Sequence, residues 1–168
     1  MAKAKTTEIT DNLDHLAGKY LTFYLEQEVY GIEILKVQEI IGMMKVTKFP
    51  KVPHFVRGVI NLRGKVIPVI DLRQKFNMTG QEDTEKTCII VTQIETEKVE
   101  MRQGILVDEV SEVIDIESAN IEQRPDFGSS SNDDFVLGVG KINDKVIILI
   151  DVEKILSDNE LISLGEAL

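Results

Sequence analysis

The stretch that decides the fold runs from Gly58 to Leu72 and reads GVINLRGKVIPVIDL. Two apolar runs flank the dipeptide Arg63-Gly64, which is the pattern of a β-hairpin with a two-residue turn. The pattern returns over residues 138–152 as GVGKINDKVIILIDV, with Asn143-Asp144 at the turn. Apolar positions and the final Asp stay in register without a gap, so the two segments are copies of one hairpin.

A second pair of segments extends the repeat towards the N-terminus of each copy. Residues 31–41, GIEILKVQEII, align with residues 104–114, GILVDEVSEVI, at an offset of 73, whereas the hairpins are offset by 80. The polar stretch 128–134 accounts for the seven extra residues of the second copy. The chain is therefore expected to contain two copies of one supersecondary unit.

Each copy also begins with a predicted hairpin, formed by Tyr20–Leu25 and Val29–Ile32 in the first copy and by Thr87–Glu95 and Val99–Val107 in the second. Between the two hairpins of a copy, apolar residues at intervals of three and four favour a short helical stretch. These residues are Ile34, Val37 and Ile41 in the first copy and Val107, Val110 and Ile114 in the second.

Single residues in the decisive hairpins carry further predictions. Proline cannot donate a ladder hydrogen bond, so the strand of Pro68 is expected to lie at a sheet edge or to carry a bulge. Asp71 and Asp151 are placed to accept the free N–H groups of a following helical turn. No long helix separates the strands, which argues against a parallel sheet.

Together these elements predict an all-β fold with short helices, in which two small five-stranded β-barrels lie side by side and strands can be exchanged between them. We expect a mobile N-terminal tail over residues 1–19, a first barrel over about 20–76, a linker over 77–86, a second barrel over about 87–156 and a C-terminal helix over 157–168.

Composition limits the classes of partner. The 168-residue chain has a net charge of −10, which repels phosphate backbones and anionic membrane surfaces. Its longest unbroken apolar run, Val146–Ile150, is too short to span a bilayer, and the N-terminus has no apolar secretory signal. We expect a cytoplasmic protein that neither binds nucleic acid nor inserts into a membrane.

Residues typical of catalytic and metal sites are few. The only cysteine, Cys88, lies in an apolar run, as an inert core thiol does. His15 and His54 have no partner at metal-ligand spacing, and no phosphate-binding glycine loop is present. The sequence thus predicts no enzyme activity, cofactor or metal, although a glycosidase-like pair of carboxylates stays open.

Residues 29–40, VYGIEILKVQEI, and 57–72, RGVINLRGKVIPVIDL, resemble the CheW family of chemotaxis coupling proteins, and the likeness continues to the C-terminal helix. It implies two five-stranded barrels and a stand-alone, non-catalytic adaptor. The adaptor would join the cytoplasmic tip of chemoreceptors to the regulatory domain of the CheA histidine kinase, in arrays at the membrane. The likeness of that domain to the adaptor leaves room for weak homo-association.

The resemblance implies a receptor-binding set: Val37, Glu39, Ile40, Leu62 and Arg63. In the family a receptor helix tip packs into an apolar groove where the barrels meet. Arg63 also stands out by itself, because Asn-Asp at the matching turn is ordinary turn chemistry and arginine gains nothing from the turn. Glu39 recurs as Glu112, so a structural role and a partner contact are equally open.

The expected kinase-binding residues are Met43, Pro125 and Phe127. Met43 belongs to a Met-Met pair that does not repeat; flexible thioethers suit an adaptable contact, and filling of the core is an equally open role. Pro125 and Phe127 lie in a loop that resembles the kinase-facing edge of the family, although Glu122 stands where the family often has a basic residue.

Two other functions stay open. One is a coupling protein for a kinase array outside chemotaxis. The other is a small-molecule-binding or enzymatic double barrel with its ligand between the lobes, which a cluster of buried polar groups would favour over an apolar groove.

Overall fold

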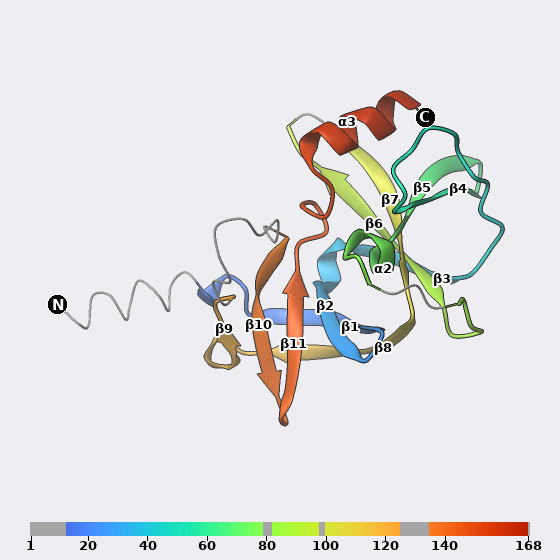
Figure 1. Cartoon of the computed structure of the whole chain (residues 1–168). Helices are drawn as coiled ribbons and strands as arrows, with labels where there is room; N and C mark the ends of the chain where they lie inside the picture. Colours follow the sequence, from blue (N-terminus) through green and yellow to red (C-terminus); the bar gives the residue numbers. More distant parts are fainter. Residues whose placement is uncertain (1–12, 79–81, 98–99, 125–134, 168) are drawn as a thin grey trace.

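A computed structural model describes residues 13–78, 82–97, 100–124 and 135–167. Among the elements whose bounds lie within these ranges, two 3-10 turns and two α-helices accompany the strands (Figure 1). In chain order they are β1 (Gly18–Leu25), β2 (Glu28–Glu33), η1 (Ile34–Lys36), β3 (Val37–Gly42), β4 (Val56–Leu62), β5 (Lys65–Asp71), α2 (Leu72–Lys75), β6 (Cys88–Glu95), β7 (Glu100–Val107), β8 (Glu109–Ile116), η2 (Ser118–Asn120), β9 (Ile121–Glu122), β10 (Val136–Ile142), β11 (Lys145–Ile150) and α3 (Asp158–Ala167).

The strands form two sheets with the same topology. The order is β8-β1-β2-β11-β10-β9 in the six-stranded sheet and β3-β6-β7-β5-β4 in the five-stranded sheet. The sixth strand is the two-residue β9, which pairs Glu122 with Val139; in the five-stranded sheet an isolated bridge from Thr47 to Val59 occupies the same place. The predicted all-β fold of two small barrel-like units with a C-terminal helix is confirmed.

Each sheet combines strands from both sequence copies. The β1–β2 hairpin of the first copy lies beside β10 and β11 of the second, while β6–β7 of the second lies beside β4 and β5 of the first. The joints are parallel, β2 with β11 and β7 with β5. Parallel pairs therefore form without a long helix, because the chain returns through the other sheet.

The helical stretch predicted after each first hairpin is wrong. Only η1 is helical in the first copy, and β3 follows it; in the second copy β7 leads almost directly into β8. The pairing of β3 with β6 shifts register between Val37 and Glu39. The bulge turns successive apolar residues to different faces of the strand. A short 3-10 turn followed by such a strand therefore places apolar residues three and four apart in sequence, as an amphipathic helix does.

Pro68 does not lie on an edge strand, because β5 is flanked by β4 and β7. Its strand pairs with β4 at Val59, but the parallel ladder to β7 begins one residue later, at Val69. At the equivalent place in the other sheet, Ile148 pairs with both Val139 and Tyr30. Proline is thus accommodated by an early end of one ladder, and not by an edge position or a bulge in its own strand.

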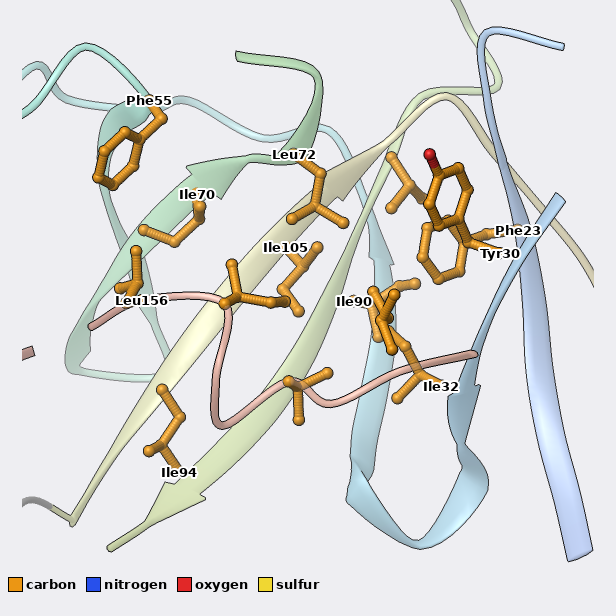
Figure 2. Packing of buried hydrophobic residues seen from close by; sticks show 14 of the residues in the cluster. Phe23, Tyr30, Ile32, Phe55, Ile70, Leu72, Ile90, Ile94, Ile105 and Leu156 are labelled. Atoms are coloured by element: carbon orange, nitrogen blue, oxygen red, sulfur yellow. The ribbon is translucent and has the colours of Figure 1, made fainter. Parts of the chain in front are cut away.

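Three apolar clusters form the interior. One lies within the five-stranded sheet and includes Ile60, Val69 and Leu106, and one lies within the six-stranded sheet and includes Tyr20 and Leu149. The largest joins the two sheets and the C-terminal helix. Figure 2 shows side chains from both sheets converging in it; among its members are Phe23, Tyr30, Ile32, Phe55, Ile70, Leu72, Ile90, Ile94, Ile105 and Leu156.

A buried ionic network also ties the sheets together. The Arg73 side chain, only 2% exposed, donates to Asp71, Asp83 and Asp108 at 3.1 Å each. The other carboxylate oxygen of Asp108 accepts from the backbone N–H of Glu26, in the turn of the β1–β2 hairpin, at 2.6 Å. Asp71 caps the turn of α2 as predicted, accepting from the Arg73 N–H at 3.0 Å.

The N-terminal boundary differs from the expected tail. Leu16 lies in the segment expected to be mobile, yet it is buried in the cluster of the six-stranded sheet. Its carbonyl accepts a hydrogen bond from the Tyr20 hydroxyl at 2.6 Å. Residues 13–19 are therefore part of the fold.

Candidate functional site

The tip of the β4–β5 hairpin is a tight turn that forces Arg63 into an unusual backbone conformation. Arg63 has φ 51° and Gly64 φ 86°, the pair of positive values that a type I′ turn requires. Asn143 and Asp144 have φ 49° and 65° at the other tip, and both residue types tolerate this region better than arginine does. The arginine is thus unfavourable for its own turn.

A bidentate salt bridge holds the Arg63 side chain. Its two terminal nitrogens donate to the two carboxylate oxygens of Glu39 at 2.5 and 2.8 Å. Because β3 and β4 are the two edge strands of the five-stranded sheet, the pair joins its edges across the mouth of the barrel. The Arg63 side chain stays 72% exposed and that of Glu39 28%. The structural role left open for Glu39 is therefore present.

Electrostatics at this mouth favour the charged form of Glu39. The hydrogen bonds from Arg63 lower the pKa of the Glu39 carboxyl, and the nearby Arg102 lowers it further. Arg102 lies on β7, two strands away from β3. The mouth of the five-stranded sheet thus brings together positive charge from the hairpin tip and from β7 around one carboxylate.

The bulge in β3 divides the expected receptor-binding residues between two faces. Glu39 pairs with Val91, which lies in the cluster inside the five-stranded sheet, whereas Val37 and Ile40 pair with Thr92 and Ile90 on the face towards the other sheet. Residues directly opposite in a ladder share a face. Val37 packs against the cluster between the sheets, while Ile40 is 44% exposed.

The remaining predicted contacts are partly core residues. Leu62 is buried, and Met43 packs against the same cluster inside the five-stranded sheet. Leu62 can therefore only position the hairpin tip, whereas Met43 is partly buried and keeps part of its side chain accessible. Pro125 and Phe127 lie outside the described residues.

Within the described residues, the interior of the junction between the barrels is filled, whereas its rim is hollowed beside Leu35 and Lys36. The junction is filled by the chain's own side chains, together with two buried polar residues, Thr92 and Gln103. The Gln103 amide donates to the carbonyl of Val152 at 3.0 Å, which ties β7 to the segment after β11. The filled interior therefore does not favour a ligand enclosed between the lobes.

Leu35, at this rim, was missed by the sequence analysis. It lies on η1, the link between the two sheets, and is 93% exposed. Its counterpart in the repeat is Asp108, the buried partner of Arg73. The signal was present, since an apolar residue that fails to repeat and is absent from the core is a candidate contact.

The described residues contain neither a metal-binding cluster nor a membrane-spanning helix. Among residues 13–78, 82–97, 100–124 and 135–167, no group of His, Cys, Asp or Glu side chains is arranged to hold a metal ion. Across the same ranges, the helices are too short or too polar to cross a bilayer.

Known proteins share both the sequence and the architecture. The CheW-like domain matches residues 19–160. The chemotaxis protein CheW of Klebsiella aerogenes is 41% identical over 143 residues, covering 85% of this chain and 84% of that protein, and CheW of Helicobacter pylori is 33% identical over 138 residues, covering 82% and 81%.

A solved structure agrees with these sequence relatives. The scaffolding protein TtCheW of Thermoanaerobacter tengcongensis superimposes with a TM-score of 0.75 at 36% identity, covering 86% of this chain and 95% of that one.

Proposed function

This chain belongs to the CheW-like domain family, and from that premise we propose that it is a non-catalytic adaptor of bacterial chemotaxis. It couples chemoreceptors to the CheA histidine kinase within signalling arrays. Support comes from relatives named chemotaxis protein CheW and from a structural neighbour described as a scaffolding protein. The protein acts in the cytoplasm and is recruited to receptor arrays at the membrane.

The observation that carries the proposal is the set of large apolar side chains that the fold leaves in water around the five-stranded sheet. Leu35 and Met44 are exposed and have no apolar counterpart in the repeat, whereas Ile40 and Val66 recur as the exposed Val113 and Val146 of the other sheet. Burial of one such side chain in an interface is worth about 1.5–3 kcal/mol before the costs of ordering. Several of them suit a contact of modest affinity, which a multivalent array would strengthen.

The two partners are assigned to different parts of this surface. The receptor's helical tip binds the rim of the junction, where Val37 and Ile40 lie beside the exposed Leu35, and reaches the tip formed by Leu62 and Arg63 with Glu39. An amphipathic receptor helix would pack its apolar side chains, spaced three and four residues apart, along this row of apolar residues at the rim. The kinase's regulatory domain binds at the side of Met43, together with Pro125 and Phe127.

Reconstitution tests the proposal. Receptor-containing membranes, the kinase and ATP are combined with and without this protein, and phosphorylation of the kinase is followed. Receptor-dependent stimulation that requires this chain is the expected result. A kinase that responds equally without it would contradict the coupling role, and recovery of only one partner in co-sedimentation would contradict the adaptor.

A further inference from the structure

The rim of the junction is hollowed around η1, and the exposed Leu35 stands between two of the hollows. One of them, called the Leu35 hollow below, has a volume of about 210 Å³. The residues that line it come from η1, β3, β6 and the segment after β11: Leu35, Lys36, Gln38, Gln93, Glu95 and Glu153. Another, of about 350 Å³, joins Leu35 to residues 15–20, at and before the start of β1. A leucine that is 93% exposed between hollows suits a partner whose side chains fill them.

The hydrogen bonds in the Leu35 hollow leave acceptors facing the partner. The Gln93 amide nitrogen donates to Glu95 at 2.9 Å and to Glu100 at 3.4 Å. Because carboxylates only accept, the amide oxygen of Gln93 points the other way, and there it accepts from the Gln38 nitrogen at 2.6 Å. The two ends of this chain are therefore the Gln38 oxygen and the second oxygen of Glu95, and both are acceptors.

Carboxylates also outnumber ammonium groups around η1. A third hollow, of about 270 Å³, borders the Lys36–Glu153 pair as well. The carboxylates that line the three hollows are Glu33, Glu95, Asp151 and Glu153, and the ammonium groups are Lys19 and Lys36. The hydrogen bond to Glu153 raises the pKa of Lys36 despite partial burial, and Glu33 and Asp151 raise it further. This end of the rim therefore favours positive charge.

The cations at the nearby barrel mouth do not reverse this balance. Arg102 lies opposite Gln93 in the β6–β7 ladder and brings positive charge towards Glu95, although it also acts on Glu39. With Glu95 assigned to the mouth, the three other carboxylates still outnumber the two lysines around η1. Lys19 also has a carboxylate of its own, Asp115, at 4.0 Å.

Most of this arrangement fails to recur at the other rim. Gln38 is the extra residue of the β3 bulge, and a bulge can turn a side chain towards a binding surface. Matching the β3–β6 ladder to the β8–β1 ladder equates Gln38 with Ser111, Gln93 with Tyr24 and Glu95 with Glu26. Only the carboxylate recurs, so the shared fold requires neither the amide pair nor the exposed leucine.

We propose that the receptor's helical tip inserts a lysine or arginine into the Leu35 hollow, where Gln38 and Glu95 accept its hydrogen bonds. Both side chains carry only donors, and their apolar stems can cover Leu35. The occupant is the receptor because Leu35 continues the apolar row of Val37 and Ile40, along which the receptor helix is proposed to lie. The inference rests on the adaptor function and names the chemistry of its receptor contact.

Separate measurements of receptor and kinase binding give the first test. The affinity of the full chain for a receptor tip fragment and for the kinase regulatory domain is compared between wild type and variants. We expect Glu95→Lys to weaken the receptor complex about tenfold and to leave the kinase complex unchanged. Glu95→Gln keeps one acceptor oxygen and should lose less, and Gln38→Ala should act in the same direction.

Glu26→Lys is the matched control, because it makes the same charge change at the exposed counterpart on the other rim. It should bind the receptor fragment normally. Thermal unfolding of every variant shows that binding is compared between folded proteins.

A double-mutant cycle gives the second test. Each lysine and arginine of the receptor fragment is changed to glutamine in turn and paired with wild type and with Glu95→Gln. One receptor position should lose most of its effect in the Glu95→Gln background. Unchanged receptor binding by Glu95→Lys, an equal loss of kinase binding, or additive effects at every receptor position would each overturn the contact and leave the coupling function standing. A wild type that does not bind the receptor fragment would overturn both.

Discussion

The β4–β5 and β10–β11 hairpins are two copies of one design, and three of the differences in and just after them change a contact. Both carry a type I′ turn, and both shift register near their first strand, at Val56–Gly58 and at Val136–Gly138. Arg63 corresponds to Asn143 and Pro68 to Ile148, and just after the hairpins Arg73 corresponds to Glu153. The residues that repeat therefore set the backbone of both hairpins, while the residues that differ set the contacts between strand edges and between the two sheets.

The third difference sets how the sheets are held together. Arg73 is buried among three carboxylates, whereas Glu153 binds Lys36 at 2.8 Å in a half-exposed pair. Removing one member of a buried ionic network leaves charges uncompensated, whereas surface pairs contribute little. Equivalent positions of the repeat thus carry a strong ionic network at Arg73, called the strong tie below, and a weak surface salt bridge at Glu153.

The largest effect is expected from breaking the strong tie. Arg73→Gln should lower the free energy of unfolding by about 3–5 kcal/mol, because Asp71, Asp83 and Asp108 lose their shared cation. Glu153→Gln, the matched change, should cost less than about 1 kcal/mol. Urea unfolding of both variants measures this, and equal losses would show that the two ties are equivalent.

The glycines at the two bulges come next. A Cβ on Gly58 would lie 2.2 Å from the Thr47 carbonyl oxygen, and φ is 147° there; on Gly138 the nearest backbone atom is the Glu122 oxygen, at 2.9 Å. Gly58→Ala should cost about 2–3 kcal/mol, and Gly138→Ala less. Gly42→Ala, with open space around it, is the control in thermal unfolding. A Gly58→Ala variant that unfolds at the wild-type temperature would contradict the close approach of the Thr47 carbonyl to Gly58.

Exchanging Pro68 and Ile148 tests the ladder difference. Ile148→Pro should cost about 2 kcal/mol, because a residue paired on both sides loses a ladder hydrogen bond. Pro68→Ile should change stability by less than about 1 kcal/mol, since the ladder to β7 already ends there. Similar losses for the two variants in urea unfolding would contradict this difference between the two ladders.

Acid should weaken the strong tie through Asp83. Partial burial alone would raise the pKa of this carboxyl, but hydrogen bonds from Arg57 and Arg73 outweigh it and leave the pKa lowered. The stability it contributes is therefore complete above the unfolded pKa of about 4 and is lost as pH falls through the folded value. Unfolding free energies of the wild type and Asp83→Asn should differ at pH 7 and converge in acid, and a constant difference would contradict this.

Much of this molecule could be predicted from its repeat. Both hairpins of each copy, the two turns and the C-terminal helix follow from local patterns, since apolar alternation and turn residues act over short distances. The pairing of β2 with β11 and of β5 with β7 could not be predicted, because either copy of the first hairpin satisfies the same local rules in either sheet. Which hairpin joins which sheet is decided by packing alone.

The candidate site divides in the same way. Arg63 could be identified because it departs from its copy, and Leu35 could have been found by the same reasoning. The bulge that sends Glu39 into the barrel mouth and Ile40 to the other face has no clear local signal, so the sequence does not reveal that these residues of β3 point to different faces. The closure of the groove depends on side chains from both sheets, which no single segment reveals.

The most direct test of the central claim compares the two hairpin tips in receptor-dependent kinase stimulation. Arg63→Glu removes the cation that faces Glu39, while Asn143→Glu places the same residue at the equivalent tip of the other sheet. Both variants should fold, since the side chains are exposed or partly exposed at turns. Arg63→Glu should reduce stimulation severalfold, and Asn143→Glu should leave it at the wild-type level. Equal stimulation by the two folded variants would contradict the role of the Arg63 tip in receptor coupling.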